Sequence, residues 1–153
     1  MRLSLTRSSP RMSHLLARLL LSLSLSLWVA GCVQKITYPP DTTLLQRFSR
    51  AEATERVRHV LLRSINPQID EVTVTEEFLN YRLQGTIIIL RLYFGNVGGV
   101  QLFENHAAFV QADGGQYIAQ LFFATAEDAK LFADLLMSFR EEFRAQSGQR
   151  EGK

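Results

Sequence analysis

Cysteine is almost absent from this sequence, because Cys32 is the only one among its 153 residues. A single cysteine cannot form an intramolecular disulfide, and it cannot supply a CxxC redox pair or a thiolate zinc cluster. Histidine is also scarce, since only His59 and His106 follow Cys32. These absences argue against a disulfide scaffold and against a metal site built from cysteine and histidine. We therefore expect no cofactor.

Acidic residues are missing from the first 31 residues, which carry four arginines. The formal net charge of +2 for the whole chain is therefore misleading, because beyond residue 31 there are 13 basic and 15 acidic residues. A mildly acidic domain gains little from counterion release on nucleic acid, and its net charge does not attract it to anionic lipid. We expect no nucleic-acid partner.

The sequence has no apolar run long enough to span a membrane. The longest candidate, Leu19 to Ala30, is interrupted only by serines and contains 12 residues. As a helix it would extend about 18 Å, against about 30 Å of bilayer hydrocarbon. A basic start, a short apolar run and small residues at its end are the layout of a signal peptide. Residues 1–31 are therefore expected to be a cleaved signal peptide.

The tetrapeptide Val29-Ala30-Gly31-Cys32 ends this run and resembles the bacterial lipobox, in which an aliphatic residue and two small residues precede a cysteine. The resemblance implies that the Cys32 thiol is alkylated by a diacylglyceryl group and that cleavage falls between Gly31 and Cys32. A nucleophilic sulfur suits this chemistry, and small side chains let a peptidase approach the backbone. The implied product is a lipoprotein anchored to a cell-envelope membrane, with Cys32 as its first residue.

The residue after the lipidated cysteine helps to sort such proteins in bacteria with two membranes. Val33 is not the aspartate that resembles an inner-membrane retention signal. The resemblance therefore implies the outer membrane, with the domain facing the periplasm. Either Met1 or Met12 can be the start, because Met12 still leaves Arg18 ahead of the apolar run.

The remaining chain divides into three parts. Residues 32–48 are predicted to be the lipidated N-terminus and a tether, because Tyr38-Pro39-Pro40-Asp41 shows no periodicity. The thirteen residues from Val33 to Leu45 would reach at most about 45 Å. Residues 49–146 are predicted to form a single folded domain. Residues 147–153 are polar and are predicted to be a disordered tail.

Two helices are predicted in the folded domain. Ser49 and Glu52 have the spacing of a capping box, and apolar residues recur at helical spacing up to the stop at Asn66-Pro67, which predicts a helix over residues 50–64. Thr125 is the predicted N-cap of a long C-terminal helix. That helix carries one apolar stripe, formed by Phe132, Leu135, Leu136, Phe139 and Phe143.

Short apolar segments between the helices predict about six antiparallel strands. The most apolar one, residues 86–94, contains Ile87-Ile88-Ile89-Leu90 and is predicted to be the central strand, covered on both faces. Asp113-Gly114-Gly115 between two apolar segments predicts a hairpin. The other strands are expected at residues 72–74, 79–83, 100–103, 106–112 and 116–124.

The predicted order of elements gives an α+β domain: an N-terminal helix, a meander of about six strands and an amphipathic C-terminal helix. From residue 71 to residue 144 this order resembles the pleckstrin-homology-like superfold, in which a C-terminal helix packs across one end of a bent sheet. The resemblance is one strand short and includes no catalytic motif. It therefore implies a fold but no activity.

Few residues are candidates for chemistry. Glu104 and His106 would share one face of a continuous strand and could form an acid–base pair or supply two metal ligands. A solvated turn between two strands is the simpler interpretation. Residues 95–99, which contain three glycines, could form a backbone nest for an anion or an ordinary turn. Residues 35–63 carry six basic and three acidic residues and could rest on anionic headgroups.

The leading hypothesis is a non-catalytic envelope lipoprotein, held at the membrane by its lipid, whose domain binds a protein partner of the envelope or acts as an assembly module. One alternative is a carrier or sensor of a lipid or cell-wall ligand. A second alternative is a hydrolytic enzyme, for which Glu104 and His106 are the only candidate residues.

Overall fold

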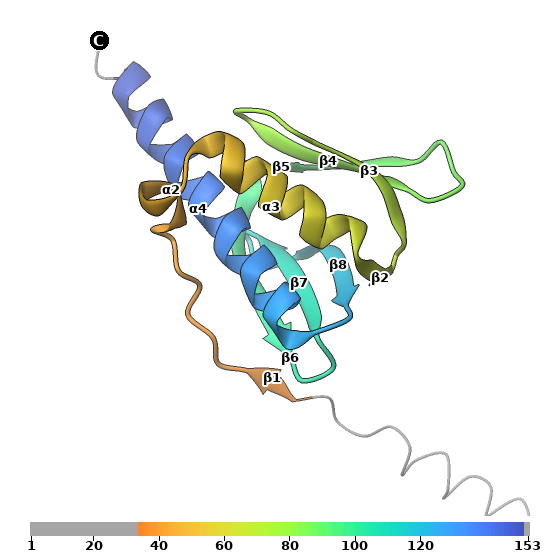
Figure 1. Ribbon diagram of the computed structural model, residues 1–153. Helices are drawn as coiled ribbons and strands as arrows, with labels where there is room; N and C mark the ends of the chain where they lie inside the picture. The colour runs from red at the N-terminus through yellow and green to blue at the C-terminus, as the bar shows by residue number, and fades with distance from the viewer. Residues whose placement is uncertain (1–33, 152–153) are drawn as a thin grey trace, which may run out of the picture. The chain divides into compact units, whose positions relative to one another are not determined.

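The structure of the protein is a computed structural model that describes residues 34–151. Within this part the fold is α+β, as predicted, and contains eight strands (Figure 1). None of the described helices is both long enough and apolar enough to cross a membrane. The elements are β1 Lys35–Ile36, α2 Leu44–Arg47, α3 Arg50–Leu62, β2 Ser64–Asn66, β3 Ile69–Val74, β4 Phe78–Leu83, β5 Ile89–Tyr93, η1 Phe94–Asn96, β6 Val97–Phe103, β7 Ala107–Ala112, β8 Tyr117–Phe123 and α4 Ala126–Glu151.

The strands form two antiparallel sheets. One sheet has five strands in the order β1-β6-β7-β8-β2, and the other has three in the order β3-β4-β5. Figure 1 shows α3 and α4 side by side, with α4 against the five-stranded sheet and α3 against β3. The buried side chains of both helices and both sheets form one hydrophobic core.

Local sequence signals explain both long helices. The Ser49 hydroxyl accepts a hydrogen bond from the Glu52 backbone N–H at 3.2 Å, and the Glu52 carboxylate accepts one from the Ser49 N–H at 2.9 Å, which confirms the capping box at the start of α3. The Thr125 hydroxyl accepts a hydrogen bond from the Asp128 N–H at 3.1 Å. In the apolar stripe that follows on α4, Phe143 is partly buried and the other four residues are fully buried.

The tail predicted at residues 147–153 is helical as far as the structure describes it, because α4 continues to Glu151. Polar composition does not end a helix by itself. This segment has no proline, and a single glycine such as Gly148 costs a helix only about 1 kcal/mol.

The tether predicted at residues 32–48 is wrong for the described part, since residues 34–48 pack on the domain. Lys35 and Ile36 pair with β6. The Tyr38 hydroxyl donates to the Asp134 carboxylate of α4 at 2.8 Å, and Leu44 on α2 is buried. A segment without periodicity can still pack on a domain when a few of its residues, such as these, make contacts with distant elements.

The central strand predicted at residues 86–94 is also wrong. The strand in this segment, β5, pairs only with β4 and lies at the edge of the three-stranded sheet. Four consecutive residues, Ile87 to Leu90, are exposed. A continuous apolar run has no period, so it does not indicate which of its faces the rest of the protein covers.

The hairpin predicted at Asp113-Gly114-Gly115 is confirmed between β7 and β8. Gly115 has a φ of +80°, and its N–H donates to the Ala112 carbonyl at 2.9 Å. A glycine adopts this left-handed conformation without the steric cost that other residues incur.

Candidate functional site

The residues predicted to carry the lipid anchor lie outside the described part of the chain. Gly31 and Cys32 both precede residue 34, where the description begins. Lipidation and cleavage at these residues therefore stay predictions from the lipobox resemblance.

Glu104 and His106 lie in the turn between β6 and β7 and not on a continuous strand. His106 adopts a φ of 61°, its N–H donates to the Phe103 carbonyl at 3.0 Å, and its carbonyl accepts from the Phe123 N–H at 3.1 Å. No hydrogen bond or ion pair joins the two side chains within residues 34–151, and no group of three potential metal ligands is found there. The structure therefore does not bring these two residues together as a reactive pair.

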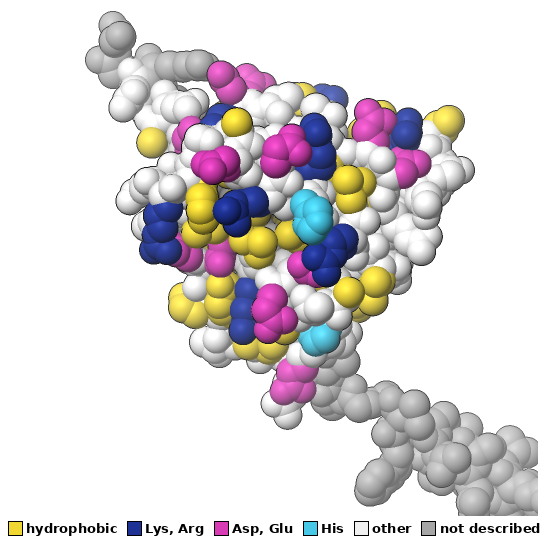
Figure 2. All heavy atoms as spheres, viewed as in Figure 1, with side chains coloured by type: hydrophobic (Ala, Val, Ile, Leu, Met, Phe, Trp, Pro, Cys, Tyr) yellow, Lys and Arg dark blue, Asp and Glu magenta, His cyan; other side chains and the backbone are white. Residues whose placement is uncertain are grey.

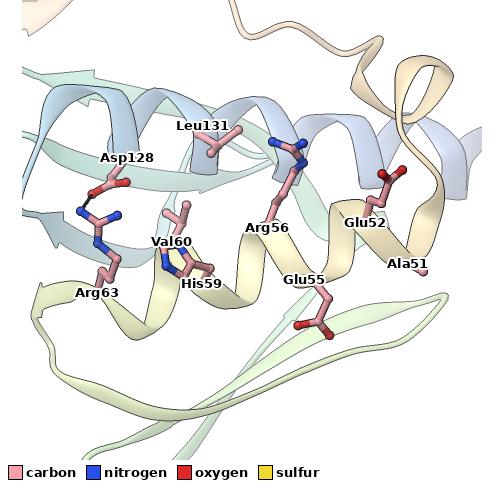
Figure 3. Close-up of a pocket in the computed structure, with 9 residues that line it drawn as sticks. All are labelled: Ala51, Glu52, Glu55, Arg56, His59, Val60, Arg63, Asp128 and Leu131. Atoms are coloured by element: carbon pink, nitrogen blue, oxygen red, sulfur yellow. Dashed lines mark ion pairs between the residues drawn. The ribbon is translucent and has the colours of Figure 1, made fainter.

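A groove lies between α3 and the first turns of α4 (Figure 3). Its volume is about 620 Å³. Figure 2 shows apolar side chains at this face with basic, acidic and histidine side chains around them. The lining residues are Ala51, Glu52, Glu55, Arg56, His59, Val60, Arg63, Asp128 and Leu131.

Most charges around the groove already have a partner. Arg63 forms an ion pair with the largely buried Asp128 at 3.4 Å. The Glu52 carboxylate accepts hydrogen bonds from Ser49, which lower its pKa. Glu55 pairs with Arg58 at 3.2 Å and points away from the other side chains in Figure 3.

Arg56 and His59 are the groups best placed to meet a ligand in this groove. The Arg56 guanidinium stacks over the Phe48 ring at 4.1 Å, a contact that orients the charge without neutralising it. Val60 and Leu131 supply apolar surface beside them. The groove can therefore hold an anionic group next to an apolar one.

Sequence reasoning missed this groove because it depends on two helices far apart in the chain. Arg56, His59, Val60 and Arg63 share one face of α3, which their spacing indicates, but nothing in the sequence places Asp128 opposite them. The basic residues expected to form a free surface are mostly committed elsewhere: Arg47 pairs with Asp41 at 3.1 Å, Arg50 with Glu142 and Arg63 with Asp128.

A second surface is formed by the edge of the three-stranded sheet. Ile87, Ile88, Ile89 and Leu90 are 96%, 51%, 58% and 39% exposed. These residues form the turn before β5 and the first half of the strand, and we call them the β5 apolar run. Tyr93 at the other end of β5 is 43% exposed. The segment that the sequence predicts to be a covered central strand is therefore an exposed apolar surface on β5 and the turn before it.

Comparison with known proteins adds no further assignment. No family model matches this chain, and neither a curated protein nor a solved structure matches it.

Proposed function

We propose that this protein is a non-catalytic lipoprotein of the bacterial cell envelope, held by lipid on Cys32, whose domain binds a protein partner. The observation that carries this proposal is the β5 apolar run, which leaves four consecutive large aliphatic side chains exposed. Contiguous apolar patches on the surface of a soluble domain often mark an interaction site. An open apolar strand edge is also a template for pairing with another chain. A partner that covers the run would prevent the edge from pairing with other chains.

The proposed anchor would hold the domain close to the membrane. Only Val33 and Gln34 separate Cys32 from β1, so the lipidated residue lies within about 10 Å of Lys35 along the chain. In Figure 1, β1 and the three-stranded sheet lie at opposite ends of the domain. A lipid on Cys32 therefore keeps β5 away from the anchor and open to a partner.

Lipid attachment itself is the first part of the proposal to test. Each buried methylene of an acyl chain contributes about 0.8 kcal/mol, so two or three chains hold the protein permanently. Metabolic labelling with a clickable fatty acid, followed by detergent partitioning, should label the wild type and not Cys32→Ser. Cys32→Ser leaves every side chain of the described core unchanged, so we expect the fold of the variant to survive. Equal labelling of wild type and Cys32→Ser would contradict the anchor.

Partner binding is tested with a photo-cross-linking phenylalanine in the full chain, in cells of the source organism. Position 89 lies in the β5 apolar run. Position 65 is the matched control, because Ile65 on β2 is 57% exposed and Ile89 is 58% exposed. We expect discrete protein adducts from position 89 and none of the same mass from position 65. Adducts that do not differ between the two positions would refute specific binding at β5.

A second candidate function, a carrier of an amphiphilic ligand, is favoured by the groove between α3 and α4. Its volume and the pair Arg56 and His59 suit an anionic head beside an apolar chain. Native mass spectrometry of the detergent-extracted protein should then show a bound lipid mass that Arg56→Ala loses. A spectrum with the protein mass alone would remove this alternative.

A further inference from the structure

We infer that β5 receives an extended segment of the partner as an added strand, and that this segment places a carboxylate side chain beside Arg91 between aliphatic neighbours. The inference rests on the proposed function and names the chemistry of its partner. It follows from the hydrogen-bonding pattern of β5, from the state of Arg91 and from the hollow beside the strand.

The backbone of β5 has one open side. Ile88 O accepts from Leu83 N at 3.1 Å, and Phe94 N donates to Glu77 O at 2.9 Å. In an antiparallel ladder the bonded positions alternate, so the even-numbered residues between Ile88 and Phe94 direct their polar groups to β4. The N–H and C=O groups of Ile89, Arg91 and Tyr93 therefore point away from β4, and no other described strand pairs with them.

Nothing on β5 protects this edge in the usual ways. Natural edge strands carry proline, lysine, a bulge or a charge that points inward. Residues 89–93 contain no proline or lysine, and their pairing with β4 is regular. The one charge, Arg91, lies opposite Asn80 on the face turned away from the core, because the neighbouring Leu92 and its partner Leu79 are buried.

The inner face of the edge has room for an aliphatic side chain. Leu92 is 3% exposed, whereas Leu90, two residues earlier on the same face, is 39% exposed. An added strand would place its own inward-facing side chains next to Leu90. Aliphatic residues at those positions would cover the part of the Leu90 side chain that the domain leaves exposed.

Arg91 supplies the charge preference. Its Nε donates to Asn80 Oδ1 at 2.8 Å, and its guanidinium lies 4.2 Å from the Phe78 ring centroid. No carboxylate of the described residues lies within 4.0 Å of it. By contrast, Arg82 on the same face pairs with Asp70 at 2.8 Å and Glu71 at 3.0 Å. The Arg91 guanidinium is therefore held in position but is not paired with a carboxylate. A carboxylate on an added strand would complement its charge.

A hollow of about 360 Å³ beside this edge leaves space for the added strand. It lies between β5 and the β7–β8 hairpin, and Asp113 on its far side is paired with Arg144 at 2.9 Å. Its lining residues are Arg91, Tyr93, Asn96, Ala112, Asp113, Gly114 and Ile118.

A second copy of this chain fits the edge less well than another protein does. Two antiparallel β5 strands that use all three open residues would pair Ile89 with Tyr93 and Arg91 with Arg91. Like charges directly opposite each other destabilise a strand pair. Charge complementarity therefore favours a different chain, one that carries an acidic residue at this position.

The test uses the full chain in mild detergent and the capped, fluorescent peptide Thr-Val-Thr-Val-Glu-Val-Thr-Val-Thr, with matched peptides that carry Gln or Lys in the centre. Fluorescence anisotropy should show binding in the order Glu, Gln, Lys, with roughly fivefold to tenfold between the first and the last. Arg91→Glu should reverse the order, and Arg91→Gln should abolish it. Arg58→Glu, an exposed charge change on α3, should leave it unchanged.

Hydrogen exchange then identifies the mode of binding. Adding the Glu peptide should slow exchange at the amides of Ile89, Arg91 and Tyr93 and leave those of Leu90 and Leu92 as they were. Absence of this alternation, no preference for the Glu peptide, or a dimer of the chain that buries β5 would overturn the inference.

These outcomes separate the inference from the proposed function. Cross-links at position 89 without a peptide preference would keep a protein partner and reject strand addition. Peptide binding with the expected alternation, but with no cross-links in cells, would support the open edge and reject the cellular role.

Discussion

Two segments of this protein can be compared through four large apolar side chains on each, yet one set lies in the core and the other on the surface. On α4, Phe132, Leu135, Leu136 and Phe139 are each 0% exposed. In the β5 apolar run, Ile87 is 96% exposed. The stripe on α4 has sheets and α3 to cover it, whereas β5 has a neighbour on one side only. Apolar composition therefore measures what can be buried, and the arrangement of neighbours decides what is buried.

The largest effect on the free energy of unfolding is expected from a substitution in the buried stripe of α4. Phe139 stacks on Phe94 with ring centroids 5.4 Å apart. Phe139→Ala should lower the free energy of unfolding by about 3–5 kcal/mol, because the lost burial adds to the cavity left behind. Chemical denaturation of the full chain measures this loss. A loss below about 1 kcal/mol would mean that the core does not depend on the α4 stripe.

A substitution in residues 34–48 tests whether this segment packs on the domain in solution. Tyr38→Phe removes the hydrogen bond to Asp134, whose Oδ1 also accepts from the Asp41 N–H at 2.8 Å. Hydrogen bonds to charged groups contribute about 1.5–3 kcal/mol, and we expect a loss in that range. An unchanged denaturation midpoint would return residues 34–48 to the role of a loose tether.

The same contact predicts a pH dependence for Tyr38. Burial and the Asp134 carboxylate raise the pKa of Tyr38 to about 12. Because the pKa is higher in the folded state, this stabilisation is complete below pH 10, the usual tyrosine value, and is lost as the pH rises through about 12. Burial also raises the pKa of Tyr81 to about 12. Tyr38→Phe should therefore lose less stability than the wild type over this interval, but not become pH-independent.

Substitution of Gly98 tests how closely the backbone of β6 packs against the backbone at Ala112. A Cβ atom at this position would lie 2.5 Å from the Ala112 carbonyl oxygen, whereas one at Gly99 would meet nothing within 4 Å. Gly98→Ala should therefore cost about 1–3 kcal/mol of stability, as overpacking does. Gly99→Ala is the matched control and should be much milder. Equal denaturation midpoints for the two variants would show that β6 and the β7–β8 hairpin can move apart.

The smallest stability effect is expected in the β5 apolar run. Ile87→Ser changes a side chain that is 96% exposed, so the free energy of unfolding should change by less than about 0.5 kcal/mol. Thermal or denaturant unfolding beside Phe139→Ala makes the comparison direct. A loss of about 2 kcal/mol or more would show that the run is buried in solution.

Features that depend on residues close together in the chain could be predicted from the sequence. Ser49 with Glu52, Thr125, and Gly115 each place their own helix start or turn by bonds to residues a few positions away. The helical period of the α4 stripe identifies its buried face. The α+β class follows from the order of such elements, and the structure confirms it.

Features that depend on distant partners could not be predicted in this way. Tyr38 is held by Asp134, and the groove at Arg56 and His59 needs α4 beside α3. The composition of the β5 apolar run predicts a central strand, but a run without a period does not show on how many sides it is covered, and the structure places it at an edge. The spacing of Glu104 and His106 predicts a shared strand face only where the strand continues, and in the structure the chain turns at these residues.

The most direct test of the account is amide hydrogen exchange, residue by residue, along β5 of the full chain without any added partner. An open edge predicts alternation: slow exchange at Leu90 and Leu92, whose amides bond to β4, and fast exchange at Ile89, Arg91 and Tyr93. Uniformly slow exchange at all five residues would contradict the account, because it would show that another part of the protein already covers this edge.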